Sequence, residues 1–257
     1  MTELVHLRHG TVAELTLDNP PLNLVSAELT QQLRKALTEV AADNAVRVLV
    51  VTGAGDRAFC AGSDIGEFAD FAGRVAEGKL LLEKLVYRQL ANLPMPTIAA
   101  IGANALGGGL ELALCCDLRI AASSARLGLP EVRLAVMPGS GGTQRITRIV
   151  GPARAKELIL TGRLLDAPRA AEIGLVSAVV PAGEALTVAR EWAAEIADRG
   201  PLAVREAKRA IDLAFDRDLD AGLAEELDAS ERLFGSNDMQ EGAAAFFEKR
   251  PPEFHGE

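Results

Sequence analysis

One glutamate, Glu111, stands alone inside the apolar stretch IGANALGGGLELALCCDLRIA, residues 101–121. The nearest charged residues along the chain are Arg88 and Asp117, and neither is spaced to pair with Glu111 on a helix. If Glu111 is buried, desolvation raises its pKa and prepares the carboxyl for proton transfer near neutral pH. The alternative is a carboxylate that is paired elsewhere or turned to solvent, which is the commoner situation.

Three consecutive glycines, residues 107–109, lie about one helical turn before Glu111. Glycine is unfavourable inside a helix, but it suits a point where a loop enters a helix and a ligand approaches the backbone. A helix that begins there presents free N–H groups and the positive end of its dipole. The segment therefore offers a pocket for a negatively charged atom and, one turn later, a carboxylate.

A second acidic residue, Glu131, follows Pro130, where a short helix is expected to start. Two more glycine-bearing loops accompany it: RAFCAGSDIGEF (57–68), which follows a predicted strand, and PGSGGTQR (138–145). Taken alone, Glu131 is better explained as a first-turn acid that stabilises a helix dipole. The loops alone are equally well explained as connections, so any functional interpretation depends on the combination.

The segments around these loops predict a layered α/β core. Residues 4–20 alternate and turn at Gly10, as a strand hairpin does, and Ser26 is placed to cap a helix over 27–43. Continuous apolar runs of strand length cover 46–53, 97–103 and 118–122. Helices then dominate, at 153–162, 186–199, 202–216, 219–234 and 238–250. We expect an α/β core with the active site over 1–195 and a C-terminal helical oligomerisation region over 196–257.

Composition limits the class of protein. Of 257 residues, 49% are hydrophobic and 25% charged, as in soluble globular proteins. The net charge of −9 argues against nucleic-acid partners and anionic membranes. Residues 98–116 are apolar enough to span a bilayer, but their glycines, Asn104 and Glu111 argue against it. The three cysteines lack metal-ligand spacing, and the N-terminus shows no signal peptide, so we expect reduced thiols and a cytoplasmic location.

Three other motifs are weak. Gly53, Gly55 and Ala58 match a dinucleotide fingerprint, but FCAGSDIG (59–66) reads as a loop where that fingerprint requires a helix. PGSGGTQR lacks the lysine of a phosphate-binding loop. The three histidines lie near the chain ends and no G-x-S-x-G motif is present, so a Ser–His hydrolase is not expected, nor is a zinc site.

Together, these segments resemble the crotonase superfamily of enoyl-CoA hydratases and isomerases. The resemblance is collinear over nearly the whole chain and is carried by NPPLNLVS (19–26), DRAFCAGSDIGEF (56–68), residues 96–121, LGLPEVRLAVMPGSGGTQRI (127–146), residues 160–181 and AFFEKR (245–250). It implies an α/β fold with a crotonase-like (ββα)-repeat spiral core and a helical C-terminal region. It also implies hydration of a trans-2-enoyl-CoA, with no metal or cofactor apart from the coenzyme A of the substrate.

The resemblance implies roles for individual residues. The backbone N–H groups of Ser63 and Gly108 would hold the thioester oxygen, although alanine is commoner than serine at the first position. Glu111 and Glu131 match the two glutamates of the hydratases. Glu111 would activate water and Glu131 would exchange the α-proton, but which is acid and which is base stays open. Gly139 matches a glycine whose backbone helps to position the water.

The remaining implied contacts belong to the coenzyme A and acyl parts of the substrate. Lys249 is a candidate phosphate contact or simply a solvated lysine, and residues 68–90 match the region that shapes the acyl pocket. Within that region Phe68, Phe71 and Leu82 either line the pocket or take part in ordinary helix packing. The implied substrate contacts in and around the first loop are Leu24, Arg57, Phe59, Ala61, Asp64 and Ile65.

Alternatives within and beyond the superfamily stay open at this point. A Δ3,Δ2-enoyl-CoA isomerase, or another crotonase-type acyl-CoA reaction, needs chiefly the carboxylate that matches Glu131, so the presence of Glu111 favours the hydratase. A non-catalytic acyl-CoA-binding or RNA-binding protein is a further alternative, and the −9 charge argues against RNA. The superfamily commonly forms homotrimers, or homohexamers built as dimers of trimers, and we expect one of these.

Overall fold

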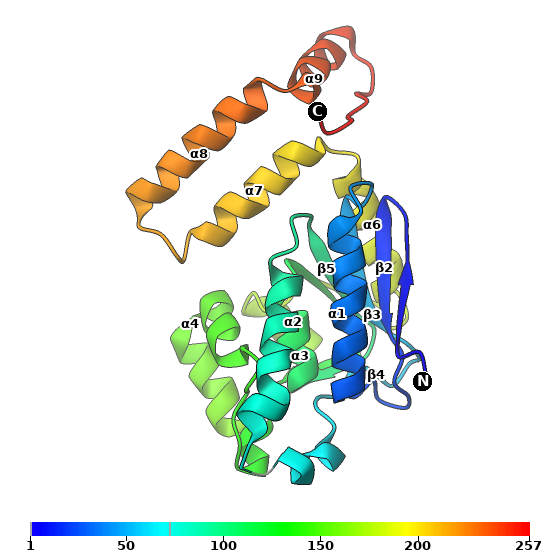
Figure 1. Cartoon of the computed structure of the whole chain (residues 1–257), viewed down its shortest axis with the longest axis vertical. Helices are drawn as coiled ribbons and strands as arrows, with labels where there is room; N and C mark the ends of the chain where they lie inside the picture. The colour runs from blue at the N-terminus through cyan, green and yellow to red at the C-terminus, as the bar shows by residue number, and fades with distance from the viewer. Residues whose placement is uncertain (1, 72) are drawn as a thin grey trace.

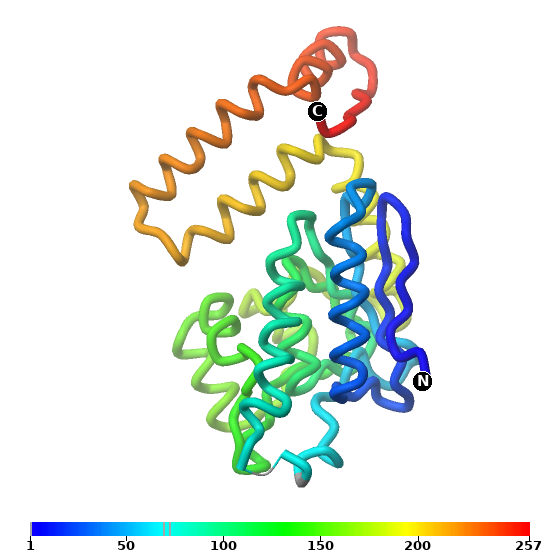
Figure 2. Tube along the Cα trace, viewed as in Figure 1, coloured from blue at the N-terminus to red at the C-terminus, as the bar shows by residue number. Residues whose placement is uncertain are grey.

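The computed structural model describes residues 2–71 and 73–257, which form an α/β body and a helical C-terminal arm (Figure 1). The body contains two sheets and the helices that cover them. The arm, residues 201–257, extends from one end of the body, and the chain ends within it (Figure 2). Over these described residues, every helix is too short or too polar to cross a lipid bilayer.

A six-stranded sheet forms the centre of the body, and it is parallel apart from its N-terminal hairpin. Along β3, Leu49 and Val51 face one apolar cluster while Val48 and Val50 face another. A strand that is buried on both faces needs apolar residues throughout, which explains the continuous run in the sequence. In order of pairing the strands are β1 (Val5–Arg8), β2 (Val12–Leu17), β3 (Val48–Gly53), β5 (Thr97–Ile101), β7 (Leu118–Ala122) and β10 (Ala178–Val180).

A second sheet pairs four short strands: β4 (Ala58–Cys60), β6 (Asn104–Leu106), β8 (Arg126–Gly128) and β9 (Leu165–Asp166). The chain places β3 in the large sheet and β4 in the small one, then repeats this with β5 and β6 and with β7 and β8. Helical segments follow each pair, so the predicted (ββα)-repeat core is confirmed. The prediction of a loop over 59–66 was wrong at both ends, because Phe59 and Cys60 belong to β4, and Ile65 and Gly66 begin the helical segment η1 (Ile65–Phe71).

Helices cover both faces of the large sheet. On one face, α6 (Ala185–Ala197) packs through alanines such as Ala189 and Ala193. On the other lie α1 (Ala27–Ala42), which begins as predicted where Ser26 Oγ accepts the N–H of Leu29, and α2 (Leu81–Ala91). The other helical segments of the body are η1 (Ile65–Phe71), η2 (Ala76–Leu80), α3 (Gly108–Ala113), η3 (Glu131–Leu134), α4 (Gly142–Thr161) and α5 (Ala167–Glu172).

Helix α4 is longer than the sequence predicts. The helix expected over 153–162 is its second half, and a non-helical Gly151, with φ of 79°, separates it from a first half that begins at Gly142. Pro152 follows this break, where its missing N–H and fixed φ are tolerated at the start of a new helical segment. The glycine-rich loop therefore leads directly into the first half of α4.

The arm consists of α7 (Pro201–Leu213), α8 (Leu219–Phe234) and α9 (Asn237–Glu248), close to the predicted helices. It is tied to the body by Arg47, whose guanidinium donates to the carbonyl oxygens of Ala197 at 2.8 Å and Phe254 at 2.5 Å. Lys208 of α7 also pairs with Asp117 of the body. Several large apolar side chains of the arm are exposed: Ile211, Phe215, Leu219, Leu223, Leu227, Phe234, Phe246 and Phe247.

Candidate active site

Glu111 is buried in the first turn of α3 and has two specific partners. Its Oε1 accepts the backbone N–H of Ser140 at 2.8 Å and that of Gly142 at 2.7 Å. Both donors come from the glycine-rich loop that leads into α4. A Cβ on Gly142 would lie 2.9 Å from this same Oε1, so glycine is what lets the loop approach the carboxylate closely.

The surroundings of Glu111 favour its protonated form. Burial raises the pKa of Glu111 to about 7, and the nearby charges of Glu131 and Glu83 act in the same direction. The N–H donors of Gly142 and Ser140 oppose the rise because they stabilise the carboxylate. Glu111 is thus buried rather than turned to solvent, and with this pKa the carboxyl can gain or lose a proton near neutral pH.

Glu131 begins the short helix η3, as the sequence predicts after Pro130. Its two carboxylate oxygens are buried and have no hydrogen-bond partner among the residues that the structure describes. Burial raises the pKa of Glu131 to about 6. A Cβ on Gly107 would lie 3.3 Å from Glu131 Oε1, which places this acid beside the glycine run that precedes Glu111.

The backbone of Ser63 lies close to Gly108, where α3 begins. Helix α3 begins at Gly108, so the N–H of Gly108 has no acceptor within the helix. The bridge between Val25 and Ser63 uses the carbonyl of Gly62 and the N–H of Asp64, which leaves the N–H of Ser63 outside it. A Cβ on Gly108 would lie 3.5 Å from Ser63 N and 3.3 Å from Ser63 Oγ, so the space between the two residues is one that a methyl group would fill.

Two other glycines set the distance between these segments. A Cβ on Gly109 would lie only 2.1 Å from the carbonyl oxygen of Cys60, and one on Gly53 only 2.2 Å from that of Phe59. Strand β4 is therefore held between β3 and α3 by direct backbone contact. Because β4 leads straight to Ser63, this contact fixes where the amide of Ser63 lies relative to α3.

The other residues expected to contact substrate lie mostly on the surface around β4. Ile65 is exposed, Ala61 and Asp64 are half-buried, and Asp64 Oδ1 accepts the N–H of Gly66 at 2.9 Å. Leu24, half-buried, precedes the bridge to Ser63. These residues surround the segment that carries the Ser63 amide.

Four further predicted residues have different surroundings. Arg57 is exposed, whereas Phe59 is buried in the main apolar cluster and presents no side chain to a ligand. Lys249 is exposed at the end of α9 in the arm, away from α3 (Figure 1). Gly139 lies against Leu80, since a Cβ there would be 2.9 Å from a methyl group of Leu80.

The acyl-pocket segment, residues 68–90, contains residue 72, which lies outside the described part. Gly78 lies against the ring of Phe71, since a Cβ there would be 2.5 Å from it. Leu82 packs at the edge of the main apolar cluster, and Phe68 is half-buried in η1.

Sequence reasoning missed several polar groups beside the site. Tyr87 is fully buried on α2, and its hydroxyl donates to the carbonyl oxygen of Gly108 at 2.9 Å. Glu83, also buried, accepts the hydroxyl of Ser140 at 2.5 Å. An ion pair links Glu83 to the buried Lys79 at 3.3 Å. The only signal in the sequence is the four-residue spacing of Lys79 and Glu83, which is typical of an exposed helix pair.

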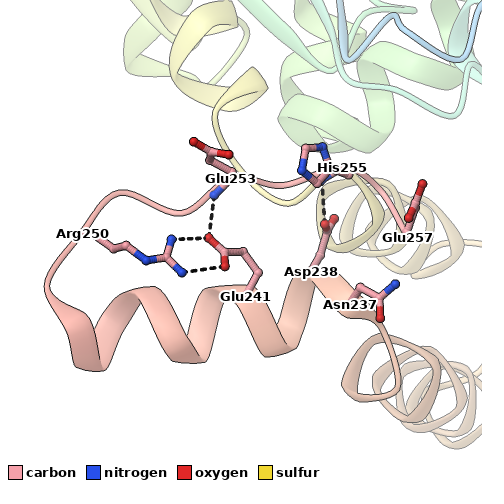
Figure 3. Close-up of a pocket in the computed structure, with 7 residues that line it drawn as sticks. All are labelled: Asn237, Asp238, Glu241, Arg250, Glu253, His255 and Glu257. Carbon is pink, nitrogen blue, oxygen red and sulfur yellow. Dashed lines mark hydrogen bonds and ion pairs between the residues drawn. The ribbon is translucent and has the colours of Figure 1, made fainter.

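A cavity of about 400 Å³ lies in the arm, far along the chain from these residues. Figure 3 shows that its polar side chains mostly hold the C-terminal tail: Glu241 binds the guanidinium of Arg250, and Asp238 accepts the N–H of His255 at 2.7 Å. Its ionic groups are therefore explained by tail anchoring. The surroundings of Glu111 differ, because two acids with buried carboxylate oxygens, Glu111 and Glu131, lie there beside a run of glycines.

Comparison with known proteins shows the family to which the chain belongs. The family model described as enoyl-CoA hydratase/isomerase matches residues 8–257. The chain belongs to the enoyl-CoA hydratase/isomerase family. The predicted resemblance to the crotonase superfamily is thereby confirmed, and so is the predicted fold.

Individual members of the enoyl-CoA hydratase/isomerase family are similar over almost their full length. A crotonyl-CoA hydratase of Syntrophomonas wolfei is 41% identical over 244 residues, covering 95% of this chain and 94% of that protein. A short-chain-enoyl-CoA hydratase of Clostridium acetobutylicum is 40% identical over 246 residues, with the same coverage of both chains. The crystal structure of an enoyl-CoA hydratase from Bacillus anthracis superposes with a TM-score of 0.96 at 43% identity and covers 99% of this chain and 100% of that one.

Proposed function

We propose that this protein is an enoyl-CoA hydratase, which adds water across the double bond of a trans-2-enoyl-CoA. The observation that carries the proposal is the pair of buried carboxyls, Glu111 and Glu131, beside the amides of Ser63 and Gly108. The two acids differ in surroundings, since Glu111 accepts two N–H groups while Glu131 has no such partner among the described residues. Acids in different environments can divide the roles of acid and base.

The thioester oxygen is stabilised by the two amides. When the nucleophile attacks C3, negative charge develops on the thioester oxygen as an enolate. The N–H groups of Ser63 and Gly108 donate to this oxygen, and each such donor is worth about 3–4 kcal/mol in comparable oxyanion holes. The thioester oxygen of the substrate is therefore the acceptor for both amides.

Water is added by transfer of two protons. In the proposed mechanism Glu111 accepts a proton from water while the water oxygen bonds to C3, and Glu131 delivers a proton to C2, so one water is added in all. The pair must therefore hold one proton. With pKa values of about 7 for Glu111 and about 6 for Glu131, the interacting pair carries a single proton over a range near neutral pH. These values favour that proton on Glu111 in the ligand-free protein, whereas the proposed addition proceeds from the form in which it lies on Glu131.

The substrate class follows from the relatives. Two similar proteins are named for crotonyl-CoA and for short-chain enoyl-CoA hydration, so we assign a short-chain enoyl-CoA to this site. The residues around β4, including Ala61 and Ile65, then lie along the coenzyme A portion. The reaction is assigned to fatty-acid metabolism in the cytoplasm.

The arm is assigned to assembly. Its exposed leucines and phenylalanines are costly to leave in water, and burying them between copies removes that cost. We assign the assembly to a homotrimer or a pair of trimers, with the α/β core over 1–195 as the catalytic part. In such an assembly the Lys249 of one copy could reach the coenzyme A site of its neighbour.

The proposal is tested with crotonyl-CoA. Loss of the enoyl-thioester absorbance, together with a product heavier by one water in mass spectrometry, is the expected result. A panel of longer trans-2-enoyl-CoA substrates sets the chain length. No hydration at any chain length would overturn the proposal, whereas conversion of a 3-enoyl-CoA without hydration would identify an isomerase instead.

A further inference from the structure

Beside the site lies a buried ionic cluster for which the hydration chemistry has no use. Lys79 and Glu83 are 3% and 2% exposed, respectively. Lys79 Nζ lies 2.8 Å from Glu67 Oε2 and 3.3 Å from Glu83 Oε1. Removal of one partner of a buried ion pair leaves an uncompensated charge, so the members of this cluster hold one another in place.

On one side the cluster reaches Glu111. Glu83 Oε2 accepts the hydroxyl of Ser140 at 2.5 Å, and the N–H of Ser140 donates to Glu111 Oε1 at 2.8 Å. Ser140 is thus bound through its side chain to one buried acid and through its backbone to the other. The position of the glycine-rich loop, and with it the orientation of the Glu111 carboxyl, depends on both bonds.

On the other side the cluster reaches the segment of Ser63. Lys79 Nζ donates to the carbonyl oxygen of Val25 at 3.1 Å, and the same oxygen accepts the N–H of Asp64 at 3.0 Å. The N–H of Val25 donates to the carbonyl of Gly62 at 2.8 Å. Lys79 therefore holds Val25, and Val25 in turn bonds the two residues on either side of Ser63, Gly62 and Asp64.

We propose that Lys79 and Glu83 are positioning residues that hold the Ser63 amide and the Glu111 carboxyl in a fixed mutual arrangement. The inference rests on the proposed hydratase function. A preorganised arrangement matters because small displacements of catalytic groups lower the rate sharply, by about a hundredfold for 1 Å. The cluster connects the two halves of the site through bonds that do not involve the substrate.

The charge of Glu83 also acts on Glu111. Two negative charges act on this carboxyl from separate elements: Glu131 from η3 and Glu83 from α2. The nearby Arg145 of α4 donates instead to the Ser140 carbonyl oxygen at 3.2 Å. After burial itself, the negative charges of Glu131 and Glu83 raise the pKa of Glu111. A neutral side chain at position 83 therefore lowers the pKa of Glu111.

The first test is Ser140→Ala, which removes the hydroxyl but keeps the N–H that donates to Glu111. We expect kcat for crotonyl-CoA to fall about tenfold while KM changes by less than about twofold, because positioning in the transition state is lost rather than substrate binding. The matched control is Thr52→Val in β3. It removes another buried hydroxyl, which donates to the carbonyl oxygen of Ala100 in β5 at 3.1 Å. This control should keep the wild-type kcat.

The second test is Glu83→Gln, which leaves an acceptor for Ser140 but removes the charge. Lys79 keeps Glu67 as its partner. The expected result is that the low-pH limb of the kcat profile moves to lower pH, a change that a merely structural residue would not cause. Lys79→Met combined with Glu83→Gln removes both charges and should lower kcat about as much as Ser140→Ala does.

Each outcome has one meaning. If wild-type protein does not hydrate crotonyl-CoA, the proposed function fails, and the positioning role fails with it. If wild-type protein is active and folded Ser140→Ala protein retains full kcat, the positioning role alone is wrong. An unmoved low-pH limb in Glu83→Gln overturns the influence of its charge. Ser140→Ala changes no charged group, so it carries the test if the charge variants do not fold.

Discussion

The amide N–H of Gly142 donates to the buried carboxyl of Glu111 at 2.7 Å, although the two residues are far apart in the chain. This bond joins the first turn of α4 to the first turn of α3. It stabilises the ionised form of an acid that burial otherwise favours as neutral. Such a balance keeps the proton of Glu111 available near neutral pH, and several predictions about activity and stability depend on it.

Removal of either acid should abolish most of the activity. In Glu111→Gln or Glu131→Gln, kcat for crotonyl-CoA hydration should fall by about 10²–10⁴, the range for a lost general acid or base. KM should change little, because neither carboxyl is assigned to ground-state binding. Glu195→Gln, on the exposed side of α6, is the control and should behave as wild type. An isomerase would instead tolerate Glu111→Gln far better than Glu131→Gln.

Ionisation of the buried Glu111 carboxyl should also lower the free energy of unfolding at high pH. Its pKa is about 7 in the folded protein against 4.5 for the ordinary group, so the folded state holds the proton more tightly than the unfolded state. The contribution of this group to stability is therefore highest below pH 4.5, falls by roughly 3 kcal/mol between pH 4.5 and 7, and stays low above pH 7. Glu111→Gln should be more stable than wild type at pH 8, by up to this amount in denaturant unfolding. A gain of equal size at pH 5 would contradict the linkage.

A methyl group at Gly108 should block the site without unfolding the protein. A Cβ there meets Ser63 Oγ at 3.3 Å and Ser63 N at 3.5 Å, which is tight but tolerable contact. It occupies the space assigned to the thioester oxygen. In Gly108→Ala, kcat should fall by about 10²–10³, as for loss of an oxyanion-hole donor, while the melting temperature stays close to that of wild type. Full activity would remove Gly108 from the oxyanion hole.

Substitution at Gly109 should differ from that at Gly108, because it should lower the stability of the fold as well as the activity. A Cβ there lies 2.1 Å from the Cys60 carbonyl oxygen, so β4 or α3 must move in Gly109→Ala. Such overpacking costs about 1–3 kcal/mol or more, measured by denaturant unfolding. The control is Gly222→Ala in α8, where nothing lies within 4 Å of the added methyl. Helix propensity predicts that this control is more stable than wild type by up to about 1 kcal/mol.

The arm should determine the state of assembly. Leu227→Glu places a charge among the exposed apolar side chains of α8, where Leu227 is 70% exposed. Light scattering should then report a monomer where wild type gives a trimer or hexamer. Leu160→Glu, at an equally exposed leucine of α4, is the matched control and should keep the wild-type mass. An unchanged mass for Leu227→Glu would exclude α8 from the interface.

Much of the fold could be predicted from local sequence signals. Ser26 and the apolar spacing after it predicted α1, and the apolar run around Val50 predicted a buried strand. The strands of the small sheet could not be found in the same way, because segments such as Ala58–Cys60 are too short to show any periodicity. Their position is set by tertiary contact with neighbours such as Gly109.

The acids of the site were easier to predict than their supports. Glu111 stands out because no partner is near it in sequence, and its burial follows from its apolar neighbours. Lys79 and Glu83 look like an ordinary surface pair at four-residue spacing, yet they are buried against Ser140 and Val25. Only the three-dimensional packing of α2 on the loops reveals this difference.

The clamping of β4 between Gly53 and Gly109 has a consequence for how the protein can change. The clamp is made by main-chain atoms and requires glycine at positions 53 and 109, so the identity of the other core side chains has little influence on it. Substitutions can accumulate in the apolar interior during evolution, while the Ser63 amide keeps its place. A protein engineer who rebuilds the acyl pocket for a new substrate should therefore keep Gly53 and Gly109, and with them the Lys79–Glu83 pair within residues 68–90, while the other apolar side chains are changed.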